Sequence, residues 1–188
     1  MIRLNITSRI SVDKNFFVDF IVAVYKAGLE IGQEKIALTF IGQIQDKGVY
    51  ETLLRLVYVL GLNEQVEFTK RSIPLSNLPE NMKEGYFINF SAGNFIGYSG
   101  IECMGLGFKT IFLNVDDRYA PTIDPDQSCY CPSFSALTDM ILKIYRDQNS
   151  FDLRILEENR LLYAGYFLTE NEERQLIEIL APSASATI

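Results

Sequence analysis

The sequence of 188 residues contains no histidine. Imidazole is the general base of Ser-His-Asp and Cys-His nucleophile pairs and a frequent zinc ligand, so sites of these kinds are excluded. If the protein is an enzyme, its protons must be moved by carboxylates, by Lys or Tyr, by the substrate or by another domain.

Cysteine is scarce as well, with three residues in the whole chain. Cys103, Cys129 and Cys131 are an odd number and lack the paired spacing of a zinc site. A C-x-C pair is also a weak disulfide signature. We therefore expect three reduced cysteines in the core or in loops.

Basic residues are outnumbered, because 17 Lys and Arg face 24 Asp and Glu and leave a net charge of −7. Nucleic-acid backbones are bound by basic surfaces, so nucleic acid is not an expected partner. Apolar runs end well before a bilayer-spanning length, and Met1 to Arg3 lead into a strand-like pattern instead of a signal-peptide core. We expect a cytoplasmic protein.

The pattern of the chain predicts a single α/β domain, and its 48% hydrophobic residues are enough for a compact core. Short apolar runs alternate with helical patterns, which is typical of βαβ units. The expected strands are 2–7, 35–41, 66–69, 86–90, 110–113 and 129–130, and the expected helices are 16–27, 50–60, 75–83, 100–106 and 133–147. The predicted fold is a Rossmann-like, doubly wound parallel sheet with helices on both faces.

Four loops follow expected strands and so belong to the same edge of this sheet, at 9–15, 42–48, 69–74 and 91–100. Doubly wound sheets bind ligands beyond the carboxyl ends of their strands. We therefore expect the four loops to converge on one crevice, and we look there for function.

A glycine-rich stretch follows the strand at 86–90, since five of the chain's twelve glycines fall between Gly93 and Gly107. Glycine lets backbone N–H groups approach a ligand closely, and the helix N-terminus that follows adds partial positive charge, which suits a phosphate or diphosphate. A tight turn with close helix packing would need the same glycines. The pattern alone does not decide between the two.

Arg9 and Lys14 lie in the loop after the first expected strand. Together they form a clamp for an anion, because Arg can bind two oxygens and Lys supplies a mobile point charge. The alternative is a solvated loop in which Lys14 pairs with Asp13.

Three further acidic residues, at two places in the chain, have a possible role in a site. Glu102 belongs to a helix expected to be largely buried, where a carboxylate needs a partner and commonly accepts hydrogen bonds from ligand hydroxyls. A salt bridge or an exposed helix face is the alternative. Asp116 and Asp117 precede Arg118 and are interpreted as a solvated turn, so no metal is assigned.

Three loops together resemble one family: the C-terminal, nucleotide-sugar-binding half of retaining GT-B glycosyltransferases, "glycosyl transferases group 1". The resemblance runs from Ile2 to about Leu180. The segment 8–15 is similar to the family's Gly-Arg-Leu and Lys-Gly segment, with Ser8 in place of the glycine. The segments 60–62 and 66–68 resemble its "LGL" helix end and "V-x-F" strand, and 94–102 resembles its E-x7-E motif.

The resemblance implies a hexosyltransferase whose donor is a UDP- or GDP-sugar, with no metal and no other cofactor. Arg9 and Lys14 would hold the diphosphate, and Glu102 would bind the ribose. Backbone amides near Tyr98 and Ser99 would complete the phosphate site. The implied catalytic residues are Arg9, Lys14 and Asn94, and the implied donor contacts are Arg9, Lys14, Thr69, Lys70, Arg71, Asn94, Gly97, Tyr98, Ser99 and Glu102, with Thr69 to Arg71 beside the base.

The resemblance further implies that a separate N-terminal domain binds a polysaccharide or glycolipid acceptor, and that the full enzyme can associate peripherally with the inner face of the cytoplasmic membrane. Residues 1–150 would form the nucleotide-sugar-binding Rossmann-like domain. Residues 151–188 would be its C-terminal helical segment, with a capping box at Thr169 and Glu172. We expect this segment to lack packing partners and to be cleaved first in limited proteolysis.

One departure from the family pattern matters for function, because Asn94 stands where the family has the first Glu of E-x7-E. Asn94 keeps hydrogen-bonding ability and loses the charge that meets the transferred sugar. The alternative function is therefore a non-catalytic module that binds a nucleotide sugar or docks onto a true transferase.

Overall fold

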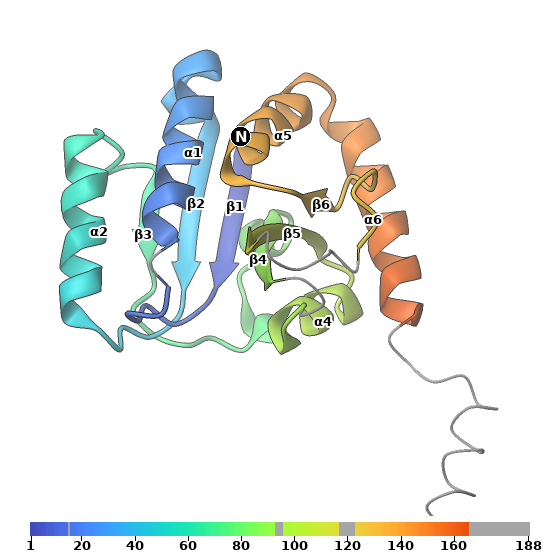
Figure 1. Cartoon of the computed structure of the whole chain (residues 1–188), viewed down its shortest axis with the longest axis horizontal. Coiled ribbons are helices and arrows are strands. Elements are labelled where there is room, and N and C mark those ends of the chain that lie inside the picture. The colour runs from blue at the N-terminus through green and yellow to red at the C-terminus, as the bar shows by residue number, and fades with distance from the viewer. Residues whose placement is uncertain (15, 93–95, 117–122, 166–188) are drawn as a thin grey trace, which may run out of the picture.

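The computed structural model describes residues 1–14, 16–92, 96–116 and 123–165 (Figure 1). Over these ranges, six parallel strands form one sheet in the order β3-β2-β1-β4-β5-β6. The strands are β1 (Ile2–Thr7), β2 (Ile36–Ile41), β3 (Val66–Phe68), β4 (Tyr86–Ala92), β5 (Lys109–Asp116) and β6 (Tyr130–Cys131). This order is that of a doubly wound, Rossmann-like α/β domain, as the sequence predicts.

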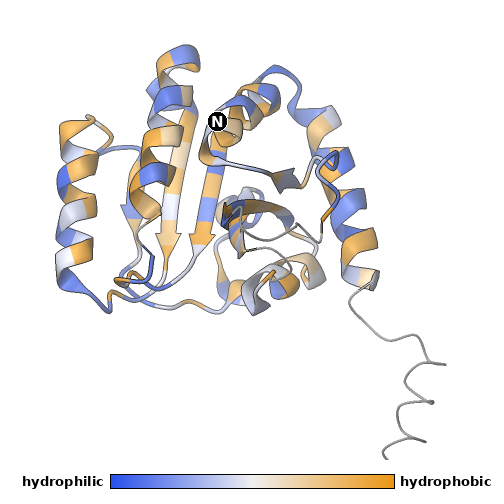
Figure 2. Cartoon of the chain, in the orientation of Figure 1, coloured by the Kyte–Doolittle hydropathy of each residue, from blue (hydrophilic) through white to orange (hydrophobic). Residues whose placement is uncertain are grey.

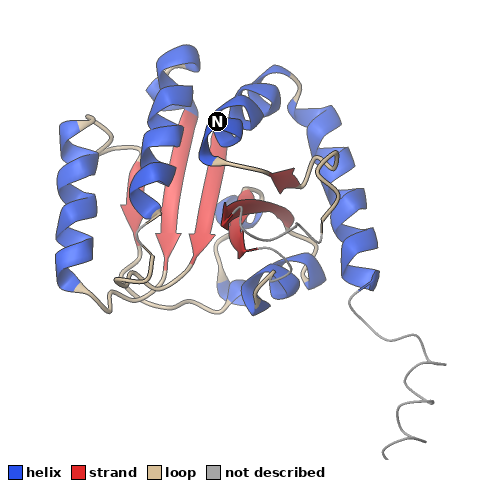
Figure 3. Cartoon of the chain, in the orientation of Figure 1, coloured by secondary structure: helices blue, strands red, loops and turns tan. Residues whose placement is uncertain are grey.

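Helices flank the sheet on both faces (Figure 3). They are α1 (Phe17–Ile31), α2 (Lys47–Val59), α3 (Glu80–Lys83), α4 (Tyr98–Gly105), α5 (Phe134–Arg146) and α6 (Gln148–Gly165), with short 3₁₀ helices η1 (Gln33–Lys35) and η2 (Leu75–Asn77). The side chains of Asp46 and Ser133 cap α2 and α5 by accepting hydrogen bonds from the N–H groups of Val49 and Ala136. None of the described helices combines the length and the apolar composition that crossing a bilayer needs.

The sequence predicts a short helix over 75–83 in which Pro79 lies in the first turn or marks a break, and the structure shows the break. The segment forms η2 and α3, which are separated at Pro79. Leu78 has an extended backbone, with φ −66° and ψ 147°, because the ring of Pro79 disfavours a helical conformation in the residue before it. The nitrogen of Pro79 also has no hydrogen to donate to a preceding turn. The break brings Leu75 and Leu78 into the core.

The core has two unequal parts. The larger part packs α1, α2 and α5 against the sheet through side chains such as Leu4, Ile6 and Phe17. The smaller part lies against η2 and α4, and its fully buried members are Ile41, Leu75, Leu78, Phe87, Cys103 and Phe108. Figure 2 shows that β2 is coloured largely as apolar, whereas the helices carry bands of both colours.

The three cysteines are buried, free thiols, as expected. Burial in apolar surroundings raises the pKa of each thiol to about 12. They are therefore protonated at neutral pH and behave as small core residues.

The expectation that the chain beyond residue 150 lacks packing partners is wrong for α6. This helix packs on β5, α4 and α5, and it buries Phe151 and Ile155. The side chain of Asn159 accepts a hydrogen bond from the backbone N–H of Thr110 (2.7 Å) and donates one to the carbonyl of Thr110 (3.0 Å). The helix also crosses the expected boundary at residue 150, while the capping box at Thr169 lies outside the described residues.

A cluster of three side chains joins the start of α6 to the amino edge of the sheet. We call Tyr86, Lys109 and Asp152 the amino-edge cluster. The carboxylate of Asp152 accepts hydrogen bonds from the Tyr86 hydroxyl (2.5 Å) and the Lys109 ammonium (2.9 Å). The ammonium lies 4.6 Å from the centre of the Tyr86 ring. Burial and the Asp152 carboxylate raise the pKa of Tyr86 above its ordinary value.

Candidate functional site

The loops at the carboxyl edge of β1 and β2 are joined to each other by their backbones. The N–H of Ser8 donates to the carbonyl of Ile41 (3.1 Å), and the N–H of Ile10 donates to that of Gln43 (3.0 Å). A Cβ atom at Gly42 would overlap the carbonyl of Ser8, so the close approach of the two loops requires glycine there. The first two loops after strands thus form one rigid rim.

A pocket of about 240 Å³ lies at this rim. We call it the carboxyl-edge pocket. Its lining residues come from the ends of β1 and β2, the loop after β3 and the start of α4: Thr7, Ser8, Arg9, Ile41, Gly42, Ser72, Ile73, Pro74, Leu75, Ser99 and Glu102. The expected convergence of loops after the strands is confirmed for the described residues, as the doubly wound topology requires.

Arg9 lines this pocket, and its guanidinium lies 3.3 Å from the carboxylate of Asp13. The ammonium of Lys14 is 3.8 Å from the same carboxylate and 5.6 Å from the Phe16 ring centre, and Lys14 is not a lining residue. The pairing of Lys14 with Asp13, the alternative from the sequence, is therefore present. One carboxylate joins the two cations.

The Ser11 hydroxyl donates a hydrogen bond to the Asp13 carboxylate. This bond, with the nearby Arg9 and Lys14, holds the pKa of Asp13 below its usual value. We call Arg9, Ser11, Asp13 and Lys14 the carboxyl-edge cluster. Asp13 is about half exposed, so water and solutes reach its partners easily.

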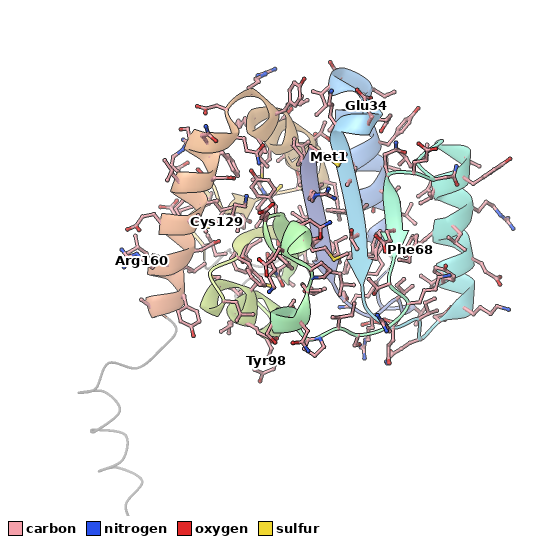
Figure 4. The ribbon with its side chains drawn as sticks, turned by 180° about the vertical axis from the view of Figure 1, so that it is seen from behind. Met1, Glu34, Phe68, Tyr98, Cys129 and Arg160 are labelled. Atoms are coloured by element: carbon pink, nitrogen blue, oxygen red, sulfur yellow. The ribbon has the colours of Figure 1, made fainter. Side chains whose placement is uncertain are left out.

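The first turn of α4 faces the pocket through Ser99. Gly97 precedes the helix with φ 71°, a conformation that favours glycine. The N–H groups of Gly100 and Ile101 donate to the carbonyl of Gly97 (3.2 and 3.4 Å). The N-terminal end of a helix carries partial positive charge, which suits an anion. The side chain of Tyr98 is 87% exposed and lies at the opposite end of the molecule from Met1 and Glu34 (Figure 4). Neither Gly97 nor Tyr98 is a pocket-lining residue.

Glu102 lines the pocket, but the expectation that it is buried is wrong. The helix α4 is short, and its buried face carries Gly100, Cys103 and Met104. Glu102 lies on the exposed side of this helix. The alternative prediction, that Glu102 lies on an exposed helix face, is confirmed, and this face borders the pocket.

The loop after β3 contributes residues other than those expected. Thr69, Lys70 and Arg71 do not line the pocket, whereas the next residues, from Ser72 to Leu75, do. The Thr69 hydroxyl accepts a hydrogen bond from the N–H of Gly42 (3.2 Å) and donates one to the carbonyl of Arg71 (2.8 Å). Thr69 thereby attaches the loop to the rim.

Lys70 points elsewhere. It has a positive φ of 59°, and its ammonium lies 5.8 Å from the centre of the Tyr50 ring. Tyr50 and Lys70 belong to a different hollow along β3. The structure therefore brings together Arg9, Ser99 and Glu102, with Thr69 in support.

Two of the residues discussed from the sequence lie outside the described part of the chain. Asn94 lies outside the described residues, as does Asp117. In the part of the chain that the structure describes, no group of three or more Cys, Asp or Glu is arranged to hold a metal ion. Thr7, Ile41 and Leu75 line the pocket although they lie outside the four expected loops. The position of Thr7 at the end of the first strand was the signal that could have indicated it.

The architecture of the chain is that of the Rossmann-like domains of GT-B glycosyltransferases. It matches HepE from Anabaena, solved in complex with UDP, with a TM-score of 0.70 at 15% identity over 95% of this chain. It also matches the C-terminal domain of LpcC, a glycosyl transferase group 1 family protein from Francisella tularensis, with a TM-score of 0.62 at 17% identity. Comparison with protein-family models and with curated protein sequences gives no match.

The chain spans about half the length of HepE, since the match covers 48% of that protein. It spans 44% of the sucrose-phosphate synthase from Thermosynechococcus elongatus, which it matches with a TM-score of 0.63 at 17% identity. By contrast, it covers 85% of the isolated LpcC domain. The similarity thus corresponds to one domain of the longer proteins.

Proposed function

We propose that this chain is the donor-binding domain of a retaining glycosyltransferase, which transfers a hexose from a UDP- or GDP-sugar to a polysaccharide or glycolipid. The observation that carries the proposal is the carboxyl-edge pocket, in which a guanidinium, a helix N-terminus and an exposed carboxylate face one space. A UDP complex of the similarly folded HepE supports a nucleotide ligand.

The three groups fit three parts of a nucleotide sugar. The diphosphate would lie between Arg9 and the first turn of α4, where a guanidinium and backbone N–H groups can bind its oxygens. Glu102 would accept hydrogen bonds from the ribose hydroxyls. Lys14 would reach the diphosphate by exchanging Asp13 for a phosphate oxygen, since both are anionic oxygen acceptors.

These groups would stabilise the departing diphosphate as negative charge develops on it, in place of a metal ion. This role requires cations and oriented N–H groups and needs no imidazole, in keeping with a chain that has no histidine. Acceptor binding would come from an N-terminal domain, and the whole enzyme would act in the cytoplasm, with peripheral contact to the membrane.

Calorimetry with UDP, GDP and their sugars tests the proposal. We expect the wild type to bind at least one of them. Arg9→Ala with Lys14→Ala should weaken binding about 100-fold or more, since hydrogen bonds to charged groups contribute roughly 1.5–3 kcal/mol each. A matched control is Lys35→Ala with Arg160→Ala, which removes two exposed cations away from the pocket. No binding by the wild type at millimolar ligand, or equal loss in both double variants, would contradict the proposal.

Asn94 favours a second candidate, a non-catalytic module that binds a nucleotide sugar, because it lacks the charge of the glutamate in the family pattern. The two candidates differ in turnover. We expect sugar transfer when the chain is supplied with an acceptor-binding partner domain, and that transfer should depend on Arg9. Nucleotide-sugar binding without transfer under those conditions would favour the module.

A further inference from the structure

One polar side chain lies buried between β4 and α4, directly behind the carboxyl-edge pocket. Asn89 is 4% exposed, and its Oδ1 accepts a hydrogen bond of 2.9 Å from the hydroxyl of Ser99. Its Cγ would lie 3.4 Å from a Cβ placed at Gly100, so it also touches the next residue of the helix. Asn89 thus contacts the first turn of α4 at two consecutive residues.

The position is costly for an amide. The Nδ2 atom of Asn89 is buried and makes no hydrogen bond to an oxygen or nitrogen atom of the described residues; the side chain interacts with the thiol of Cys103, which is a weak hydrogen-bonding group. A buried donor without a good acceptor loses its hydration without compensation, and an apolar side chain of similar size would avoid this cost. Packing alone therefore does not account for asparagine here.

The helix that Asn89 contacts is poorly secured at its N-terminus. The capping residue is Gly97, so no side chain caps α4, whereas Asp46 and Ser133 cap α2 and α5. The helix has only eight residues, and helices this short depend on tertiary contacts. The Ser99–Asn89 hydrogen bond ties the first turn to the sheet in place of a cap.

We propose that Asn89 is a positioning residue for the diphosphate of the donor. By holding the hydroxyl of Ser99, it fixes the first turn of α4 so that the backbone N–H groups of that turn face the pocket. The Ser99 hydroxyl is occupied as a donor, so the turn binds phosphate through its N–H groups. This inference rests on the proposed function. It adds that Asn89 supports the part of the site that would bind the diphosphate.

If Asn89 positions the diphosphate, its replacement should weaken the binding of ligands that carry phosphate and spare those that do not. Asn89→Leu should weaken UDP binding about five- to ten-fold and leave the weaker binding of uridine within two-fold, because uridine has no phosphate. Ser99→Ala removes the same hydrogen bond from the partly exposed side and should have the same effect. The double variant should bind UDP no more weakly than either single variant, since both remove one interaction.

Asn5→Leu is the matched control. Asn5 is also a buried asparagine of a central strand, 1% exposed, but its Nδ2 donates to the carbonyl of Met82 (2.8 Å), away from the pocket. This variant should lose stability and keep its UDP affinity. Calorimetry measures UDP, and saturation-transfer NMR measures uridine.

Amide hydrogen exchange supplies a readout that needs no ligand. We expect faster exchange in the first turn of α4 in Asn89→Leu and in Ser99→Ala, and no change there in Asn5→Leu. Unchanged exchange, additive losses in the double variant, or equal weakening of UDP and uridine would each overturn the role of Asn89. Absence of UDP binding by the wild type would instead overturn the proposed function.

Discussion

Two clusters of cations and carboxylates lie at opposite edges of the same sheet and differ in burial. In the amino-edge cluster, the Lys109 and Asp152 side chains are 13% and 25% exposed, and their N–O distance is 2.9 Å. In the carboxyl-edge cluster, Arg9 and Asp13 are 53% and 49% exposed, and the two cations stand 3.3 and 3.8 Å from the Asp13 carboxylate.

Both clusters combine cations with a carboxylate, but the amino-edge cluster is a structural ion pair and the carboxyl-edge cluster is a candidate for ligand binding. Both oxygens of Asp152 are occupied, one by Tyr86 and one by Lys109, so the amino-edge cluster has little capacity for a ligand. The cations of the carboxyl-edge cluster keep donors accessible to solvent, and Arg9 borders a pocket. Charged side chains at the end of a strand therefore indicate a ligand-binding site only when they are also known to be exposed.

The largest expected effect on stability is at the amino edge. Asp152→Ala should lower the free energy of unfolding by about 3 kcal/mol, because it leaves a largely buried ammonium without its partner. Urea denaturation measures the change. Glu157→Ala, which breaks the exposed pair with Arg160 on the same helix, is the control and should leave the denaturation midpoint unchanged. Equal midpoints for the two variants would remove the contrast between buried and exposed pairs.

A smaller effect is expected at Tyr86. Tyr86→Phe should cost about 1 kcal/mol, the typical contribution of one hydrogen bond, and should leave Lys109 paired. Because the folded-state pKa of Tyr86 is raised, the wild type keeps this contribution below the ordinary tyrosine pKa of 10.0 and loses stability as the pH rises above it. The variant should show a flatter decline in alkaline urea titrations. Parallel declines would contradict a raised pKa at this position.

The smallest effect on stability is expected at the carboxyl edge. Asp13→Asn should leave the denaturation midpoint unchanged at neutral pH, since its ion pairs are exposed. It should raise UDP affinity about three-fold, because a carboxylate that competes with phosphate for Arg9 and Lys14 is removed. The pKa of Asp13 lies below 3.8, so the carboxylate is ionised at neutral pH and the affinity difference should shrink only in more acidic solution. Weaker binding by the variant would show that Asp13 orients the cations instead of competing for them.

The sequence predicts the strands and the edge that carries the pocket because both depend on local pattern. The alternation in 2–7 and the glycine at 61, which has a positive φ, are visible without a structure. Exposure is a tertiary property, so Glu102 could not be placed from its apolar neighbours alone. Lys70 and Ser72 are close in sequence and face different hollows, because the positive φ of Lys70 redirects the chain between them.

The attachment of α6 to β5 has a consequence for how the sheet ends. Among the described residues, β6 pairs with β5 only at Phe112 and Leu113, so no strand lies beside Thr110 on the side away from β4. The Asn159 side chain presents one donor and one acceptor to the backbone groups of Thr110, as a peptide group of another strand would. Exposed strand edges invite pairing with other chains, so one asparagine on a helix protects this part of the edge from association with another molecule.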